Sequence, residues 1–454
     1  MSKYGEWALA GVLCVFASVG CTRSPTEKFL LAVSEGKGVV PLPKGGLELT
    51  APIVLGPRAN GLEITGQPGD VVRAKKGTEL RGFFICRECK KVTFRDFSIE
   101  GDPDARGRPA EMPPADTNLR EYFTGNGIII EGGQGVTVRQ MKFRELSGFA
   151  VLTAFDKDTT VEKSEFTDSG TRNSKGHNTG AGGLAFTDGS TGFHVTGNTF
   201  KRLFGNGVWV HSIARADRSQ NGIIEGNHFE NISRDTVLLS RAYKMVIRKN
   251  TGRLIGFPTD TVNSDLRPPA AIGTEGKVDG STIDGNSYEQ VNGRCFDLDG
   301  FHDGTIANNS CVNRGAAADY PNGGYGLVLD NGSPEMHSQQ VNIHDNTIDG
   351  MRWGGIFLIG SGHRVVHNRL LRLNLQGCTA ATRDADCMPN VDDPLLARSG
   401  IYMGLRGLRP DPVEGALVEG NEITGLGMGS GGCVAYAPQV KPTDSTVRGN
   451  TCHE

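Results

Sequence analysis

The sequence predicts an all-β protein, a single parallel solenoid with three short sheets and about 12 coils. Three observations predict it. The 454 residues include 64 glycines and only 37% hydrophobic residues, a composition rich in turns and poor in long apolar helices. A valine or isoleucine stands three residues before an asparagine at nine places in the chain. Short strand-like segments that begin with glycine recur between these asparagines.

The asparagine repeat has a minimal unit of 22 or 23 residues, which loops of different sizes lengthen. Two residues after the asparagine comes an apolar or aromatic residue or a cysteine, in every copy but the one with Gly252. We expect the asparagines to stack at one corner, where their amides bond to each other and to backbone groups. They are Asn198, Asn227, Asn250, Asn286, Asn309, Asn346, Asn368, Asn421 and Asn450.

A second repeated element, GIxL, supplies the strands of another sheet. It begins at Gly127, Gly183, Gly207, Gly326, Gly355 and Gly400. Alternate residues of a strand point to opposite faces, so the third and fifth residues of each segment face outward. One coil, near Ala271, does not show the pattern. Successive coils hydrogen-bond to one another at a spacing of about 4.8 Å.

The VxxNxF and GIxL repeats resemble those of the pectate-lyase-like right-handed parallel β-helix family, over roughly residues 46–454. The resemblance implies a right-handed parallel β-helix in which the GIxL strands form the floor of a substrate groove. It says less about the reaction, because lyases, hydrolases, epimerases and phage or adhesin proteins share these repeats.

The N-terminal segment, residues 1–21, has the features of an export signal. Its apolar run is too short to span a bilayer, and small residues precede Cys21 as in a bacterial lipobox. We expect a bacterial lipoprotein, lipidated at Cys21 and held at the outer membrane or cell surface only by that anchor, or a secreted protein. Residues 22–60 are expected to form a linker and N-terminal cap, and residues 61–454 the β-helix.

Net charge and cysteine spacing exclude some partners and suggest crosslinks. A net charge of −3 creates no field that would attract nucleic acid, so we expect no nucleic-acid partner, and a monomer. Eight cysteines remain beyond Cys14 and Cys21, and in an exported chain they suggest disulfides. They form the local pairs 86/89, 295/311, 378/387 and 433/452. The CxxC spacing of the first pair also suits free or zinc-binding thiols.

The stretch CFDLDGFHDG, residues 295–304, places Asp297 and Asp299 outward on a groove strand. Asp330 has the position of Asp299 on the next coil, which predicts about 5 Å between them and about 8 Å diagonally from Asp297. The diagonal suits an inverting glycoside hydrolase, and the closer pair suits a shared proton or a calcium ion. With His302 nearby, we take these four residues as catalytic candidates. Solvated acids at strand ends are the alternative interpretation.

A second group of candidates surrounds Trp209. His211 ends the same strand and Arg241 follows the next groove strand, and a base and a cation beside an aromatic ring suit a uronate site. We therefore add His211 and Arg241 to the catalytic candidates. An outward tryptophan also suits stacking on sugars. The predicted substrate-binding residues are Trp209, Phe357, Tyr402 and Arg406.

Long insertions at the ends of the groove strands are expected to wall a cleft. They lie at residues 100–126, 168–182, 212–222, 256–270, 313–325, 330–341, 374–399 and 404–416. The insertion 374–399 carries two cysteines and Asp384, Asp386, Asp392 and Asp393, which suggests a stapled loop and a calcium site within it. The expected cofactor is therefore none, or calcium.

Together these features predict an exported polysaccharide-active protein, a lyase or glycoside hydrolase acting on an acidic, uronate-containing glycan. One alternative is a non-catalytic surface β-helix that binds glycan or a protein partner. A lesser alternative is a uronan epimerase, because His302–Asp303 matches half of the acid-flanked His-Asp of mannuronan epimerases.

Overall fold

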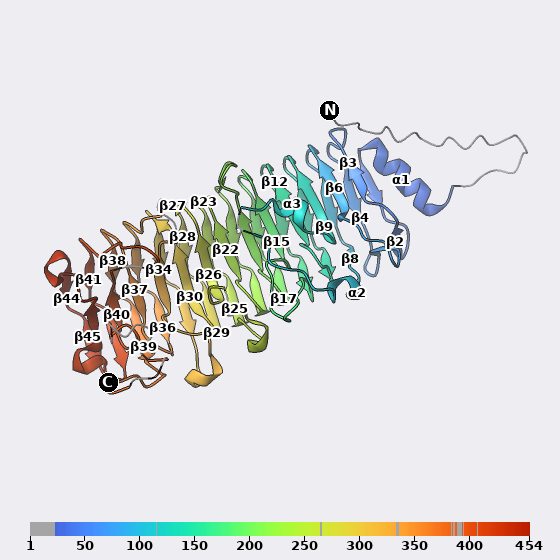
Figure 1. Ribbon diagram of the computed structural model, residues 1–454. Helices are drawn as coiled ribbons and strands as arrows, with labels where there is room; N and C mark the ends of the chain where they lie inside the picture. Colours follow the sequence, from blue (N-terminus) through green and yellow to red (C-terminus); the bar gives the residue numbers. More distant parts are fainter. Residues whose placement is uncertain are drawn as a thin grey trace, which may run out of the picture.

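The protein is one elongated solenoid, with its N-terminal coils at one end and its C-terminal coils at the other (Figure 1). The computed structural model describes residues 23–454 apart from 115, 264–265, 333–335, 383, 385, 388–392, 394 and 406. The predicted signal segment, the lipidation site Cys21 and the binding residue Arg406 lie outside the described residues. In the described part of the chain, no helix is long and apolar enough to cross a membrane.

Sheet A holds the valine and isoleucine positions of the asparagine repeat, in 14 parallel strands among the described residues. Their middle residues point inward and their flanking residues outward. The strands are β1 (Val39–Pro41), β4 (Glu63–Thr65), β7 (Thr93–Arg95), β10 (Thr137–Arg139), β13 (Thr160–Glu162), β16 (His194–Thr196), β20 (Ile223–Glu225), β24 (Val246–Arg248), β28 (Thr282–Asp284), β32 (Thr305–Ala307), β35 (Asn342–His344), β38 (Arg364–Val366), β41 (Leu417–Glu419) and β44 (Thr446–Arg448).

Sheet B follows the asparagine corner and also has 14 strands in the described chain. Its inward aromatic rings stack from coil to coil, with centroids 4.7 Å apart from Phe166 to Phe200 and from Phe200 to Phe229. The strands are β2 (Gly46–Leu49), β5 (Val71–Ala74), β8 (Ser98–Glu100), β11 (Lys142–Arg144), β14 (Glu165–Thr167), β17 (Thr199–Leu203), β21 (His228–Ile232), β25 (Thr251–Ile255), β29 (Ser287–Val291), β33 (Ser310–Val312), β36 (Thr347–Asp349), β39 (Arg369–Leu373), β42 (Glu422–Gly425) and β45 (Thr451–His453).

Sheet C contains the GIxL strands and completes each coil, with 13 strands in the part of the chain that the structure describes. They are β3 (Ile53–Leu55), β6 (Gly82–Arg87), β9 (Asn126–Glu131), β12 (Val151–Ala154), β15 (Leu184–Thr187), β18 (Val208–His211), β22 (Val237–Ser240), β26 (Ala270–Glu275), β30 (Arg294–Asp299), β34 (Leu327–Asp330), β37 (Ile356–Leu358), β40 (Ile401–Met403) and β43 (Val434–Tyr436). A short sheet D lies beyond it, with β19 (Ser219–Gln220), β23 (Ala242–Tyr243), β27 (Val278–Asp279) and β31 (Phe301–His302).

Short helices decorate the solenoid. Helix α1 (Pro25–Glu35) lies against the first coils, where it buries Phe29 and Val33 (Figure 1). Two helices, α2 (Pro103–Arg106) and α3 (Leu119–Tyr122), belong to the insertion before β9. Single turns occur at Thr259–Thr261, Ala317–Asp319, Met428–Gly432 and Pro442–Asp444. The described sheets have up to 14 strands, against about 12 coils predicted, because the first coils carry neither repeat pattern.

The predicted asparagine ladder is confirmed. The side-chain amide of Asn286 donates to the Oδ1 of Asn309 at 2.9 Å and to the carbonyl of Ile247 at 3.0 Å, and its own Oδ1 accepts from Asn250. The same pattern runs from Asn198 to Asn450. All four local cysteine pairs of the described chain are disulfides, as predicted.

Candidate functional site

Two rows of outward-facing side chains run along sheet C, and the strand register fixes them. The coil that the sequence does not align near Ala271 is β26, which contributes Gly273 and Glu275 to the rows. One row contains Ala185, Trp209, Leu238, Gly273, Asp297, Val328, Phe357 and Tyr402. The other contains Thr187, His211, Ser240 and Glu275, and continues with Asp299 and Asp330.

Asp299 and Asp330 are register partners on β30 and β34, as the sequence predicts. The Oδ1 of Asp299 accepts a hydrogen bond from the Gly332 backbone at 2.5 Å, and the Oδ1 of Asp330 accepts from the Asn331 backbone at 2.7 Å. Burial raises the pKa of Asp299 to about 6, and the Asp330 carboxylate beside it adds to the rise. Asp299 therefore holds a proton over part of the range near neutral pH.

Asp297, two residues earlier on the same face, has different surroundings. It is only 2% exposed, and its carboxylate pairs with Arg294 at 2.6 Å and with Arg267 at 3.4 Å. The diagonal from Asp297 to Asp330, which the sequence suggests as a pair of reacting carboxylates, therefore has one member bound between two guanidinium groups. This arrangement favours a positioning role for Asp297.

Arg267 is a central residue of the site that sequence reasoning missed. It comes from the loop before β26 and pairs with three acids, among them Asp235 and, at 2.9 Å, Glu275. A Cβ atom on Gly273 would lie 2.8 Å from the Arg267 guanidinium, so glycine leaves the space that the arginine fills. Burial opposes the charge of Glu275, but Arg267, Arg234 and the Ser240 hydroxyl together lower the pKa of that carboxyl. In the sequence, the glycine at an outward strand position, Gly273, is the feature that could have indicated a large side chain packed over the strand.

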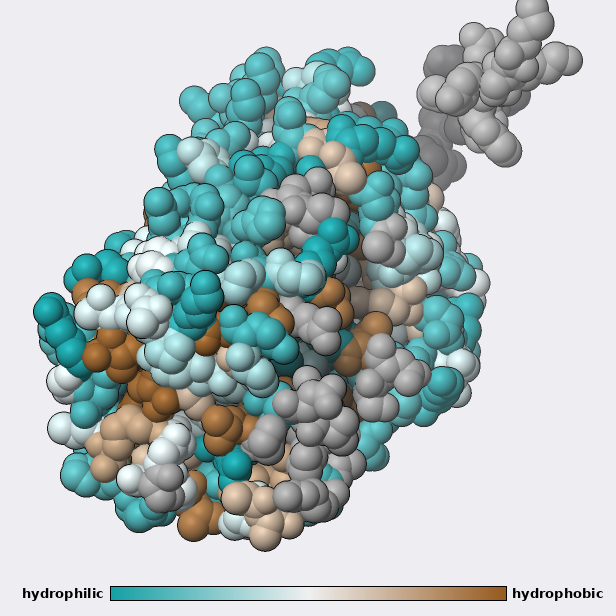
Figure 2. Space-filling model, turned by 60° about the vertical axis from the view of Figure 1, so that its left-hand side comes forward, coloured by the Kyte–Doolittle hydropathy of each residue, from teal (hydrophilic) through white to brown (hydrophobic). Residues whose placement is uncertain are grey.

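A cavity of about 510 Å³ lies beside Asp330, on the outward face of sheet C. The sheet contributes Val328 and Phe357 to it, and the insertions 313–325, 374–399 and 404–416 wall it, as predicted. In Figure 2, where the C-terminal end of the solenoid comes forward, apolar residues lie in gaps between hydrophilic ones. The lining residues from the loops include Pro321, Tyr325, Arg352, Trp353, Asp386, Leu396 and Gly407.

Two of the predicted sugar-stacking rings lie at this cavity or beneath it. The Phe357 ring stacks on the Tyr402 ring at 5.5 Å, and the Tyr325 ring meets Phe357 edge-on at 5.9 Å. Phe357 is half-buried and lines the cavity, whereas Tyr402 is only 2% exposed. The prediction that Tyr402 faces a ligand is therefore wrong, because it supports Phe357 from the next coil.

The expectation of an exposed Trp209 is also wrong. Trp209 is only 4% exposed, because the insertion before β9 folds over it and packs Leu119 and Phe123 against the ring. Its Nε1 donates to the Oγ of Ser240 at 3.1 Å, and that hydroxyl donates in turn to Glu275. Trp209 is thus part of a satellite apolar core on the outer face of sheet C.

The three remaining candidates do not join the Asp299–Asp330 pair. His211 lies under the same insertion, 3.2 Å from the Thr117 carbonyl, and burial lowers its pKa. Arg241 donates to the Ala214 carbonyl at 3.1 Å. The turn after Asp299 carries His302 onto sheet D, where its Nδ1 lies 2.9 Å from the Oδ2 of Asp303. Sequence spacing alone could not reveal these separations.

Around Asp299 and Asp330, the described residues are not arranged as a calcium site. Within the described residues, no group of three or more histidine, cysteine, aspartate or glutamate side chains is arranged to hold a metal ion. Backbone N–H groups already point at Asp299 and Asp330, and such donors oppose a cation at the same oxygens. In the stapled insertion, Asp386 pairs with Arg352 at 2.8 Å, and Asp392 lies outside the described residues.

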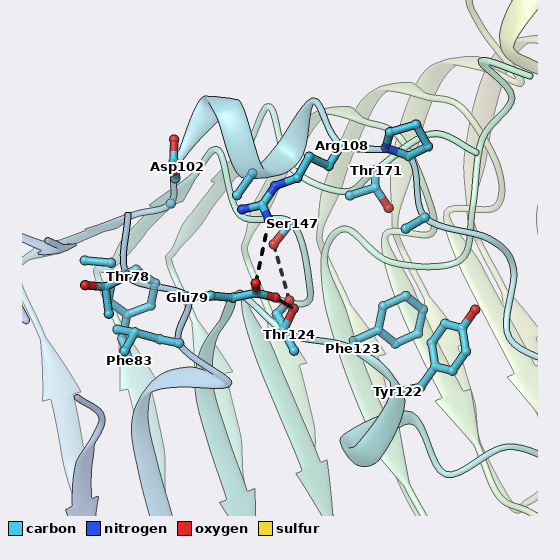
Figure 3. Close-up of a pocket in the computed structure, with 17 residues that line it drawn as sticks. Thr78, Glu79, Phe83, Asp102, Arg108, Tyr122, Phe123, Thr124, Ser147 and Thr171 are labelled. Carbon is cyan, nitrogen blue, oxygen red and sulfur yellow. Dashed lines mark hydrogen bonds and ion pairs between the residues drawn. The ribbon is translucent and has the colours of Figure 1, made fainter. Parts of the chain in front are cut away.

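A second cavity, of about 270 Å³, lies near the N-terminal end, under α2 and α3 (Figure 3). The Glu79 carboxylate accepts from the Thr124 hydroxyl at 2.8 Å and pairs with Arg108 at 3.7 Å. These polar groups turn toward one another, and no second carboxyl pairs with Glu79 among the described contacts of this cavity. The cavity beside Asp330, together with its register partner Asp299, is therefore the candidate site.

The fold and the groove define a right-handed parallel β-helix with a walled acidic site on one sheet. The family model for the right handed beta helix region matches residues 116–253, which confirms the resemblance read from the repeats. No curated protein sequence matches the chain.

Solved structures share this fold at low sequence identity. The catalytic unit of a thermostable GH87 α-1,3-glucanase from Streptomyces thermodiastaticus strain HF3-3 is 12% identical, with a TM-score of 0.56 over 87% of this chain and 65% of that one. A GH87 α-1,3-glucanase catalytic domain in complex with nigerose is 14% identical, with a TM-score of 0.54 over 95% and 68%. PfbA, a surface adhesin of Streptococcus pneumoniae, is 12% identical, with a TM-score of 0.52 over 76% and 84%.

Proposed function

We propose that the protein is a glycoside hydrolase that cleaves a polysaccharide in the sheet C groove, with Asp299 as the general acid. The observation that carries the proposal is the buried Asp299 carboxyl, with its pKa raised to about 6, beside the Asp330 carboxylate. Glycosidases need one carboxyl that holds a proton near working pH and a second that acts as a carboxylate.

In the proposed reaction, Asp299 donates its proton to the glycosidic oxygen as the bond from that oxygen to the anomeric carbon breaks. The Asp330 carboxylate stabilises the positive charge that develops on the sugar ring and assists attack at the anomeric carbon. Water supplies the new hydroxyl and the proton that restores Asp299. Arg267 and Arg294 hold Asp297 and thereby keep β30 in position.

A lyase has less support from the site. Proton abstraction beside a carboxylate needs a base and a cation that neutralises that carboxylate. The base and cation predicted from the sequence are His211 and Arg241. They contact Thr117 and Ala214, respectively, rather than one shared cavity. The acidic-glycan specificity predicted from the sequence needs the same cation to bind the carboxylates of the glycan.

Solved structures with this fold include both α-1,3-glucanases and a surface adhesin, so the fold suits catalysis and binding alike. The disulfides support the further proposal that the chain is exported, because disulfides persist in oxidising compartments. Lipidation at Cys21 stays a prediction.

The test is a glycan panel assayed for reducing ends and for the ultraviolet absorbance of unsaturated products in the same reactions. We expect reducing ends without unsaturated products, and a loss of about 100-fold or more in Asp299→Asn. Glu79→Gln, in the N-terminal cavity, is the matched control and should keep full activity. Unsaturated products would show a lyase instead. Glycan binding without any product would show the non-catalytic alternative.

A further inference from the structure

We infer that the cavity beside Asp330 binds a neutral sugar unit, so that the substrate is a neutral glycan and not a polyuronate. The inference rests on the proposed function, because it names the substrate class of the same site. It depends on the pairing of the arginines, the charge left on the wall and the chemistry of the cavity lining.

The two arginines among the described lining residues, Arg294 and Arg352, are bound to acids of this chain. Arg352 pairs with Asp386 at 2.8 Å, and its Nε and Nη1 donate to the Gln376 side chain and the Pro321 carbonyl. Arg294 pairs with Asp297 at 2.6 Å. A polyuronate needs guanidinium groups that can turn to its carboxylates, and here it would have to displace an acid that is already held in place.

The charge that remains on the wall is negative. Among the described lining residues, Asp386 is balanced by Arg352, and Arg294 is balanced by Asp297. Asp330 also lines the cavity, and its carboxylate accepts from the backbone N–H groups of Asn331 and Leu408. A polyanion entering the cavity would meet this carboxylate, for which the described lining residues supply no compensating cation, and like charges at close range repel.

The lining itself suits a neutral sugar. The half-buried rings of Trp353 and Phe357 offer apolar surface to the C–H faces of a pyranose. Trp353 packs against the Gly324 backbone, and Tyr325 meets Phe357 edge-on, so the aromatic wall is well supported. Ionised carboxylates such as Asp386 are pure hydrogen-bond acceptors, and sugar hydroxyls are donors.

The test has two arms. The first compares the binding of neutral and anionic glycans, and the second frees Arg352 from its ion pair with Asp386. The full chain and its Asp299→Asn variant are run in affinity electrophoresis against dextran, laminarin and galactomannan, and against polygalacturonate and alginate. We expect at least one neutral glycan to be bound at least tenfold more tightly than either polyuronate. Equal or tighter binding of a polyuronate would overturn the inference.

The second arm uses Asp386→Asn, which removes the exposed partner of Arg352. We expect it to gain at least tenfold in affinity for polygalacturonate at low ionic strength, with an unchanged melting temperature. The control is Glu79→Gln, which makes the same charge change and releases Arg108 in the N-terminal cavity. No gain in Asp386→Asn, or the same gain in both variants, would overturn the inference.

The two proposals fail in different ways. Binding of a neutral glycan without turnover would contradict the hydrolase proposal and would still agree with the inference that the cavity takes a neutral sugar. Release of reducing ends from polygalacturonate would contradict the inference of a neutral substrate and would still agree with the hydrolase proposal.

Discussion

Asp297 and Asp299 are the same residue type on one face of one strand, and their surroundings give them different chemistry. Two arginines bind the Asp297 carboxylate. The hydrogen bond that Asp299 accepts comes from a backbone N–H, and burial next to Asp330 raises its pKa to about 6. Such environments distinguish a carboxyl that can act as an acid, Asp299, from one that positions its strand, Asp297.

This raised pKa predicts how stability depends on pH. The folded protein holds the Asp299 proton more tightly than the unfolded chain does, so its contribution to stability is complete below about pH 4 and is lost as pH rises through about 6. Asp299→Asn should therefore raise the free energy of unfolding by about 2–3 kcal/mol at pH 7.5 and change it little at pH 4. Urea unfolding at both pH values measures this. The same change in the free energy of unfolding at pH 4 and pH 7.5 would contradict a raised pKa for Asp299.

At the residue scale, the sequence predicts the Asp299–Asp330 pair because strand alternation and coil register determine it. It does not predict Glu275, since AAIGTE lacks the GIxL pattern, nor Arg267, since loop conformation follows no periodicity. The burial of Trp209 is missed for a related reason. Whether an outward strand position meets solvent depends on which insertion folds over it.

At the scale of elements, the asparagine ladder fixes one corner of every coil from β16 onward. From Asn198 to Asn421, each amide is buried and bonds to the next asparagine and to a backbone carbonyl of the preceding coil. Since the valine-to-asparagine spacing gives the register of both flanking sheets, the sequence predicts their strands well. The early coils lack the asparagine, and there Ser164 accepts from the Met141 backbone in its place.

Removing one rung should destabilise the solenoid. Asn286→Ala leaves buried donors and acceptors of two neighbouring rungs unsatisfied, and we expect the free energy of unfolding to fall by about 1–3 kcal/mol. The matched control is Asn342→Ala, an outward, half-buried position in β35. Denaturant unfolding of both variants measures the difference. Equal stability of the two would show that the ladder contributes nothing beyond an ordinary surface position.

The stapled insertion 374–399 is crosslinked by the Cys378–Cys387 disulfide, and its exposed Asp386 side chain forms an ion pair with Arg352. We therefore expect EDTA to leave both the melting temperature and the glycan-cleaving activity unchanged. Thermal unfolding and the reducing-end assay, each with and without added calcium, measure this. If EDTA lowers the melting temperature or the activity and calcium restores it, the protein binds calcium and this expectation is wrong.

At the scale of the whole molecule, the solenoid supplies a rigid floor and its insertions supply the walls. The three sheets run continuously past the groove, so Asp299 and Asp330 lie on paired strands and not on loops. The repeats predict this architecture because each coil packs chiefly on its neighbours. The cavity walls come from insertions without a repeat, and only the structure shows which of them meet.

The most direct test of the central claim, that Asp299 protonates the leaving oxygen, is to remove the need for that proton. Wild type and Asp299→Asn are compared on the polysaccharide that the enzyme cleaves and on a dinitrophenyl glycoside of the same sugar, whose leaving group departs unprotonated. We predict that the substitution lowers kcat/KM for the polysaccharide about 100-fold or more and for the dinitrophenyl glycoside only slightly. Equal losses on both substrates, or full activity on the polysaccharide, would contradict the account.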